Sequence, residues 1–261
     1  MMKVQKMKIT PAIAKEMLKR NAGNRKFKPR EAEHLKKEIL EGRWRLNGDT
    51  ICFDEFGLID GQHRLSAIVA AGVAVETLVV EDLEDGLFPT KDVGSRRSAS
   101  DTLGAVGEKY ASPLASSLML LERYHTGKVL TKIGYRNTEV LELLGKYPDA
   151  RDSFPLCHAT HNLVAPSVLG AAHYLFAEKD PEAAEMFVRD LISGVGLDSS
   201  DAVYILRERL MVNRFAAKKL NRIEVFALLI KAWNFRREGK ACKILRWSGL
   251  GKGSEKFPEV A

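Results

Sequence analysis

The chain has 261 residues, a formal net charge of +7 and 45% hydrophobic residues, which suits the packed core of one large domain or two modest ones. It contains no apolar run of membrane-spanning length, and its basic N-terminus lacks the apolar stretch of a secretion signal. Three widely spaced cysteines, Cys52, Cys157 and Cys242, indicate reduced, buried thiols rather than disulfides or a zinc site. We therefore expect a cytoplasmic protein with no membrane partner.

The first third of the chain alternates short strands with helices. Thr10 and Pro11 are a typical cap and first residue of a helix, and Gly42 and Gly72 are placed to end two later helices. In chain order we expect an edge strand at 7–9, a helix from 11, a polar loop at 21–28, a helix at 30–41, a hairpin at 50–59, a helix up to 72 and a strand at 73–80. This order predicts a small α/β domain.

The sequence Asp60-Gly61-Gln62-His63-Arg64 marks the break between the hairpin and the helix that follows it. We expect Asp60 to cap this helix and Gly61 to let a ligand approach the backbone. The first N–H groups of the helix, together with His63 and Arg64, would then bind an anion such as a phosphate. An ordinary turn and cap with a solvated first helical turn remains the alternative.

This box resembles the strand-to-helix motif of the ParB/sulfiredoxin superfamily, in particular its phage-type members. The corresponding box is of a Gly-Cys-His-Arg type in sulfiredoxins, Gly-Glu-Arg-Arg in ParB proteins and Asp-Gly-His-His-Arg in free-serine kinases, and all three hold nucleotide phosphates. The segment Asn21-Ala22-Gly23-Asn24-Arg25 is similar to the Asn-x-x-x-Arg segment of ParB proteins. The resemblance covers about residues 7–95. The box has no cysteine, which excludes sulfiredoxin chemistry, and it lacks Glu-Arg-Arg, so a preference for CTP does not carry over.

The resemblance implies that the protein binds a nucleoside triphosphate or diphosphate, with Mg²⁺ as a further expected component. The residues implied in phosphate binding are Gly61, Gln62, His63, Arg64, Asn21, Asn24 and Arg25. Asp60 and His63 are the candidate catalytic residues for NTP hydrolysis or phosphoryl transfer, which depend mainly on positioning and electrostatics. Asp49, Glu31 and Asp92 are candidate general bases, and the sequence does not rank them. The resemblance also implies a bacteriophage or prophage origin, and it allows a homodimer.

We expect the first domain to span residues 1–110. Within it, residues 81–110 are predicted to be an addition to the α/β core rather than a new core. Arg96 and Arg97 follow a glycine turn, and as forked donors they would close over a phosphate. The alternative is that Ser98 or Ser100 simply caps a helix that runs to Leu103.

From residue 111 to 261 the pattern is helical almost throughout, so the fold class is α+β with a mainly α-helical C-terminal domain. The clearest helices are expected at 168–177, 181–192, 202–212 and 223–237. His158 and His161 stand three apart, but a zinc site needs three or four ligands, so we predict no metal site.

The C-terminal segment is basic and aromatic, which supports an alternative function. Between Lys231 and Lys256 there are eight Lys and Arg residues but only two acidic ones. Cations beside aromatic rings suit phosphate contact and base stacking, so a non-catalytic, ParB-like DNA-binding protein is the alternative to a nucleotide-using enzyme. The opposing interpretation is that the tryptophans belong to the core and the cations to a solvated rim. The candidate DNA-binding residues are Arg236, Arg237, Lys240, Lys243, Arg246 and Trp247.

Overall fold

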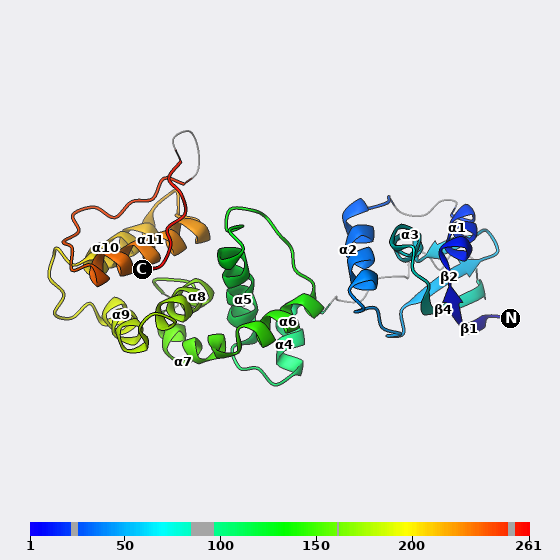
Figure 1. Cartoon of the computed structure of the whole chain (residues 1–261), viewed down its shortest axis with the longest axis horizontal. Coiled ribbons are helices and arrows are strands. Elements are labelled where there is room, and N and C mark those ends of the chain that lie inside the picture. The colour runs from blue at the N-terminus through cyan, green and yellow to red at the C-terminus, as the bar shows by residue number, and fades with distance from the viewer. Residues whose placement is uncertain (22–25, 85–96, 161, 250–253) are drawn as a thin grey trace. The chain divides into compact units, whose positions relative to one another are not determined.

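The computed structural model describes residues 1–21, 26–84, 97–160, 162–249 and 254–261 (Figure 1). Contacts divide the chain into two compact units, residues 1–95 and 96–261. The described residues form one mixed four-stranded sheet and a larger number of helices, which confirms the predicted α+β class.

The first unit contains the sheet, whose strands lie in the order β1-β4-β2-β3. Strand β4 (Val75–Leu83) is antiparallel to β1 (Lys3–Ile9) and parallel to β2 (Thr50–Asp54), and β3 (Leu58–Asp60) returns antiparallel to β2. Strand β1 begins at residue 3 rather than at the expected residue 7. The hydrophobic pattern missed residues 3–6 because backbone pairing with β4 holds them while their side chains stay exposed.

Three helices accompany this sheet: α1 (Pro11–Lys19), α2 (Pro29–Leu40) and α3 (Gln62–Ala71). Thr10 caps α1 as predicted, because its Oγ1 accepts a hydrogen bond from the Ile13 N–H at 3.2 Å. Helix α3 packs against both α1 and α2. Its residues Leu65 and Ile68 are fully buried with Ile51 and Phe53 of β2 in the core of this unit. The start of α3 is therefore held by the core on one side.

Helices and connecting segments without strands make up the described residues of the second unit, and each helix predicted for it is present. Its main helices are α4 (Ala99–Ala105), α5 (Ala111–His125), α6 (Asn137–Lys146), α7 (Phe154–Cys157), α8 (Pro166–Ala177), α9 (Pro181–Ser193), α10 (Ala202–Phe215) and α11 (Arg222–Arg237). Short 3₁₀ helices occupy Pro148–Ser153 and His158–Thr160. The contact boundary falls before residue 96, earlier than the expected 110, because α4 packs on α5 and α6.

Helix α8 is the centre of the second unit, and it packs against α5, α9 and α11. Small residues let its neighbours approach closely: a Cβ atom on Gly170 would lie 2.9 Å from the Phe154 ring. At the other end of α8, Phe176 stacks on Trp233 of α11 with ring centroids 4.4 Å apart and planes at 5°. The C-terminal segment returns to α11, where Trp233 Nε1 donates to the Ala261 carbonyl (Figure 1).

All three cysteines are buried and outside any disulfide, as the sequence predicted. Burial raises the pKa of Cys157 to about 12, which makes its thiol unreactive near neutral pH. In the part of the chain that the structure describes, we find no helix that is both long and apolar enough to span a bilayer.

Candidate functional site

The junction between β3 and α3 is formed by a glycine in a left-handed conformation. Gly61 has φ of +108°, and a Cβ atom there would lie 3.1 Å from Ile51 Cγ1 and 3.2 Å from Ile51 Cα. Glycine is therefore required by the backbone turn and by the packing of β2, since Ile51 fills the space that we expected a ligand to use. Gly61 is also the N-cap of α3, so no side chain caps this helix.

Asp60 does not cap α3, contrary to our expectation, because the carboxylate is engaged elsewhere. Asp60 Oδ2 accepts a hydrogen bond from Arg64 Nη2 at 2.9 Å, and the same nitrogen donates to the Thr50 carbonyl at 2.6 Å. Arg64 Nη1 lies 3.7 Å from Asp49 Oδ2. The side chains of Arg64 and Asp60 are 18% and 23% exposed. The ion pair thus lies at the edge of the junction, partly shielded from water.

One nitrogen of Arg64 remains without a partner. Its Nε is buried and has no hydrogen-bond partner among the described residues. Because a buried donor without an acceptor costs free energy, this atom is a point where a ligand oxygen would be stabilised.

Gln62 and His63 are buried, with exposed fractions of 4% and 6%. His63 Nε2 accepts a hydrogen bond from the Lys28 N–H at 3.0 Å, and the Phe27 ring stacks on the imidazole with centroids 5.1 Å apart. Asn21 Nδ2 donates to Gln62 Oε1 at 3.4 Å. We expected His63 to help bind an anion, but the described residues around it cover its side chain. The sequence carried no signal for this cover, since nothing in the pattern pairs residues 27 and 28 with residue 63.

His63 also has a different hydrogen-bonding role from the expected one. A ring nitrogen that accepts from a backbone N–H is unprotonated, so in this arrangement Nε2 of His63 does not donate to a phosphate. Its observed role is to hold residues 27 and 28 against the start of α3.

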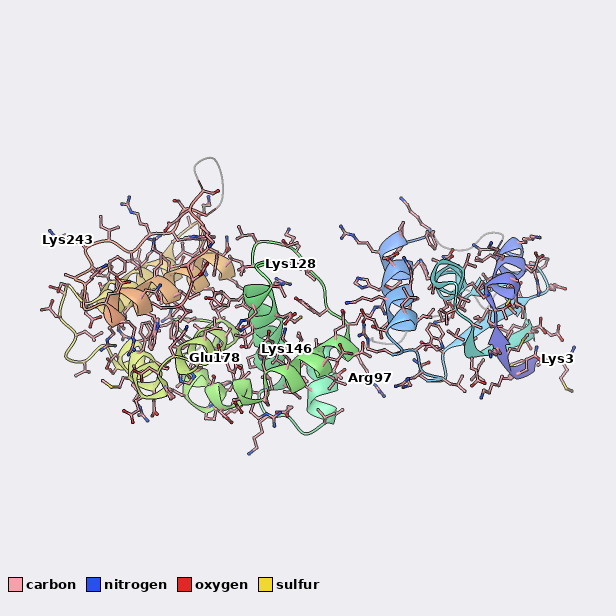
Figure 2. The ribbon with its side chains drawn as sticks, viewed as in Figure 1. Lys3, Arg97, Lys128, Lys146, Glu178 and Lys243 are labelled. Carbon is pink, nitrogen blue, oxygen red and sulfur yellow. The ribbon has the colours of Figure 1, made fainter. Side chains whose placement is uncertain are left out.

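The other predicted phosphate ligands are dispersed. Asn24, Arg25 and Arg96 lie outside the described residues, as does the candidate base Asp92. Arg97 belongs to the second unit, where its carbonyl accepts from Asn137 Nδ2 at 3.0 Å (Figure 2). Ser98 caps α4 through a reciprocal pair of hydrogen bonds with Asp101, which confirms the capping alternative. Of the two other candidate bases, Asp49 reaches the junction, whereas Glu31 lies in the first turn of α2.

Carboxylates neutralise much of the basic C-terminal segment. Arg236 Nη2 lies 2.5 Å from Asp190 Oδ2, Arg237 Nη1 lies 2.6 Å from Asp180 Oδ2, and Lys240 Nζ lies 2.6 Å from Glu238 Oε2. The carboxylates that pair with the two arginines belong to α9 and its N-cap, far away in the sequence. Counting charges within the C-terminal segment therefore did not reveal them.

The aromatic residues of that segment belong to the core. Trp247 is 7% exposed and packs edge-to-face on Phe257, and Trp233 is 1% exposed. Lys243 and Arg246 are exposed, and within the described ranges neither has a carboxylate within 4.0 Å; Lys243 projects from the surface in Figure 2. Of the six candidate DNA-binding residues, only Lys243 and Arg246 are therefore exposed cations without a carboxylate partner among the described residues.

Metal-ligating side chains do not cluster in this protein, as far as its described residues extend. They contain no group of three or more His, Cys, Asp or Glu side chains that could hold an ion. His158 packs against Tyr110 with centroids 5.1 Å apart, and His161 lies outside the described residues.

Comparison with known proteins yields no relative: no family model, no curated protein and no solved structure matches the chain. The likeness to the ParB/sulfiredoxin superfamily therefore depends on the motif residues themselves.

Proposed function

We propose that residues 1–95 form a ParB/sulfiredoxin-like module that binds the phosphates of a nucleoside triphosphate or diphosphate at the β3–α3 junction. In this proposal the protein is a phage or prophage phosphotransferase or NTPase, and Mg²⁺ accompanies the nucleotide. The observation that carries it is the position of Arg64, whose guanidinium lies beside the start of a helix that no side chain caps. Helix starts of this kind attract anions through their N–H groups and dipole.

Phosphate binding would require Arg64 to exchange one partner for another. A phosphate oxygen is a stronger charge partner than the Asp60 carboxylate, which shares Nη2 of Arg64 with the Thr50 carbonyl, and it would also satisfy the buried Nε of Arg64. Asp60, released from the ion pair, would then be available to hold Mg²⁺ through water or to orient the attacking group.

Residues 26–30 would form the cover of the bound nucleotide. Lys26, Lys28 and Arg30 are exposed cations in a segment that already contacts His63 through Phe27 and the Lys28 N–H.

The test is nucleotide binding by the intact chain, measured as thermal stabilisation with ATP, ADP, CTP and GTP, each with and without Mg²⁺. A ligand at about 100 times its Kd stabilises the folded state by about 2.7 kcal/mol. We expect Arg64→Ala to reduce the shift, and Arg45→Ala, which removes an exposed arginine bonded only to nearby carbonyls among the described residues, to preserve it. An unchanged shift in R64A, or no shift with any nucleotide, contradicts the proposal.

A further inference from the structure

The second unit contains a groove lined by cations and apolar side chains. It has a volume of about 500 Å³ and lies between one face of α5, the loop at residues 129–132 and the first residues of α11. The cations Arg123, Lys132 and Arg222 line it, and none of the described residues that line it is acidic. A groove of this size accommodates a ligand as large as a nucleotide.

The two arginines of the groove lack carboxylate partners. Arg123 Nη2 donates to the Ile133 carbonyl at 2.5 Å, and Arg222 Nη2 donates to Ser167 Oγ at 3.0 Å. Among the described residues neither guanidinium has a carboxylate oxygen within 4.0 Å, whereas Arg236 and Arg237 of the same helix α11 are both ion-paired. Arg123 Nε is buried and has no hydrogen-bond partner in the described part of the chain.

Electrostatics at this place are unfavourable without a bound anion. Arg222 is the first residue of α11, where the helix dipole is positive and a cation destabilises the helix. Partial burial of the guanidinium and repulsion by Arg123 both lower the pKa of Arg222. The nearby carboxylate Glu224 is used in the capping box, since its Oε2 accepts from the Asn221 N–H at 2.7 Å. An uncompensated cluster of this kind is typical of a functional site rather than a structural one.

The remainder of the lining is apolar. Met119 and Leu120 of α5, Val129 and Leu130 of the loop, and Ile223 of α11 face the same groove. An inorganic ion would leave these side chains uncovered, whereas an anion attached to an apolar or flat body would bury them.

We infer that this groove binds an organic phosphate, with the phosphoryl group between Arg123 and Arg222 and its attached body over Met119, Leu120 and Ile223. The phosphate is favoured over a single carboxylate because two forked guanidinium groups and Lys132 offer more charge and more donors than one carboxylate would use. A free nucleotide and a nucleic-acid strand both present this chemistry. The site is independent of the β3–α3 junction, which lies in the other unit.

The experiment is a calorimetric titration of the full chain with AMP, with inorganic phosphate and with a short oligo-dT. We expect AMP to bind more tightly than inorganic phosphate. Arg222→Gln should weaken AMP binding by about 10- to 100-fold, the loss expected for a hydrogen bond between charged groups. Arg214→Gln, which removes an exposed arginine of α10 outside the groove, should leave the affinity unchanged.

Arg123 needs a milder substitution, since its bond to Ile133 also supports the loop. Arg123→Lys keeps the charge but removes the forked donors of the guanidinium group. We therefore expect a smaller loss of AMP affinity than in R222Q and a native melting curve. An oligo-dT that displaces AMP and binds more tightly identifies a strand as the ligand, and one that does not displace AMP identifies a free nucleotide; both support the site. Equal affinity for AMP and inorganic phosphate, undiminished affinity in R222Q, or an equal loss in R214Q overturns it. Arg64→Ala distinguishes the two sites, because it removes only binding at the junction.

Discussion

Arg64 is bonded to Asp60, one helical turn earlier in the chain, across the point where β3 becomes α3. The pair occupies the position at which we propose that a phosphate binds, so the carboxylate and the phosphate compete for one guanidinium. This competition makes the roles of the two residues separable by substitution.

Replacement of the carboxylate should therefore strengthen nucleotide binding while removing turnover. Asp60→Asn loses the ion pair and leaves Arg64 free for phosphate, so we expect a larger thermal shift with ATP but no phosphate release. The cost in unfolding free energy should be about 1 kcal/mol, since the pair is partly solvated. Glu33→Gln, at an exposed carboxylate of α2 that pairs with Lys36, serves as the control. A weaker ATP shift in D60N would show that Asp60 contributes to binding instead.

Gly61 should be much less tolerant of substitution than Gly72 at the other end of the same helix. Both have positive φ, but a Cβ at Gly61 meets Ile51 whereas one at Gly72 meets nothing within 4 Å. We expect Gly61→Ala to lower the free energy of unfolding by about 2–4 kcal/mol and Gly72→Ala by about 1 kcal/mol. Urea denaturation measures both, and equal losses would show that the contact with Ile51 is relaxed at no cost.

The C-terminal part of α5 should respond to acid through Glu122. Burial alone would raise the pKa of Glu122, but hydrogen bonds from Lys146 and Tyr147 lower it below its usual 4.5. A carboxyl group with a lowered folded-state pKa stabilises the protein above its unfolded pKa, and this stabilisation is lost as the pH falls through the folded value.

Glu122→Gln should accordingly be less stable than the wild type near neutral pH, by about 1–2 kcal/mol. This difference should shrink as the pH falls below about 4.5, the range in which the wild-type carboxyl becomes protonated. Urea denaturation from pH 3 to pH 7 measures it, and a difference that stays constant with pH would exclude the charge of Glu122 as its source.

Arg236 should contribute to stability rather than to DNA binding. Arg236→Gln removes the partner of Asp190 and Asp201, so we expect a loss of about 1–3 kcal/mol and little change in DNA affinity. Lys243→Gln should lower DNA affinity and leave the stability nearly unchanged, because this exposed lysine has no ion-pair partner among the described residues. Fluorescence anisotropy over a salt series provides the test, and a large decrease of the salt slope in R236Q would restore the segment as a DNA-binding surface.

The sequence alone determined the local structure of this protein. Helix caps such as Thr10, the glycine that ends α3 and the alternation of strands and helices in residues 1–80 depend on neighbours a few positions away, and short-range patterns therefore predicted them. The same is true of the α+β class and of the buried cysteines. Strand β1 was only partly predicted, because pairing with β4, not its own hydrophobic pattern, holds its first residues.

Only the tertiary structure decided how the charged residues are used. Arg236 and Arg237 meet carboxylates that lie 46 and 57 positions away, and the cover on His63 comes from residues 35 positions earlier. The groove with Arg123 and Arg222 joins residues almost a hundred positions apart. Charge and hydrogen bonding act between groups that folding brings together, so composition and spacing revealed which cations exist but not which of them a carboxylate had already neutralised.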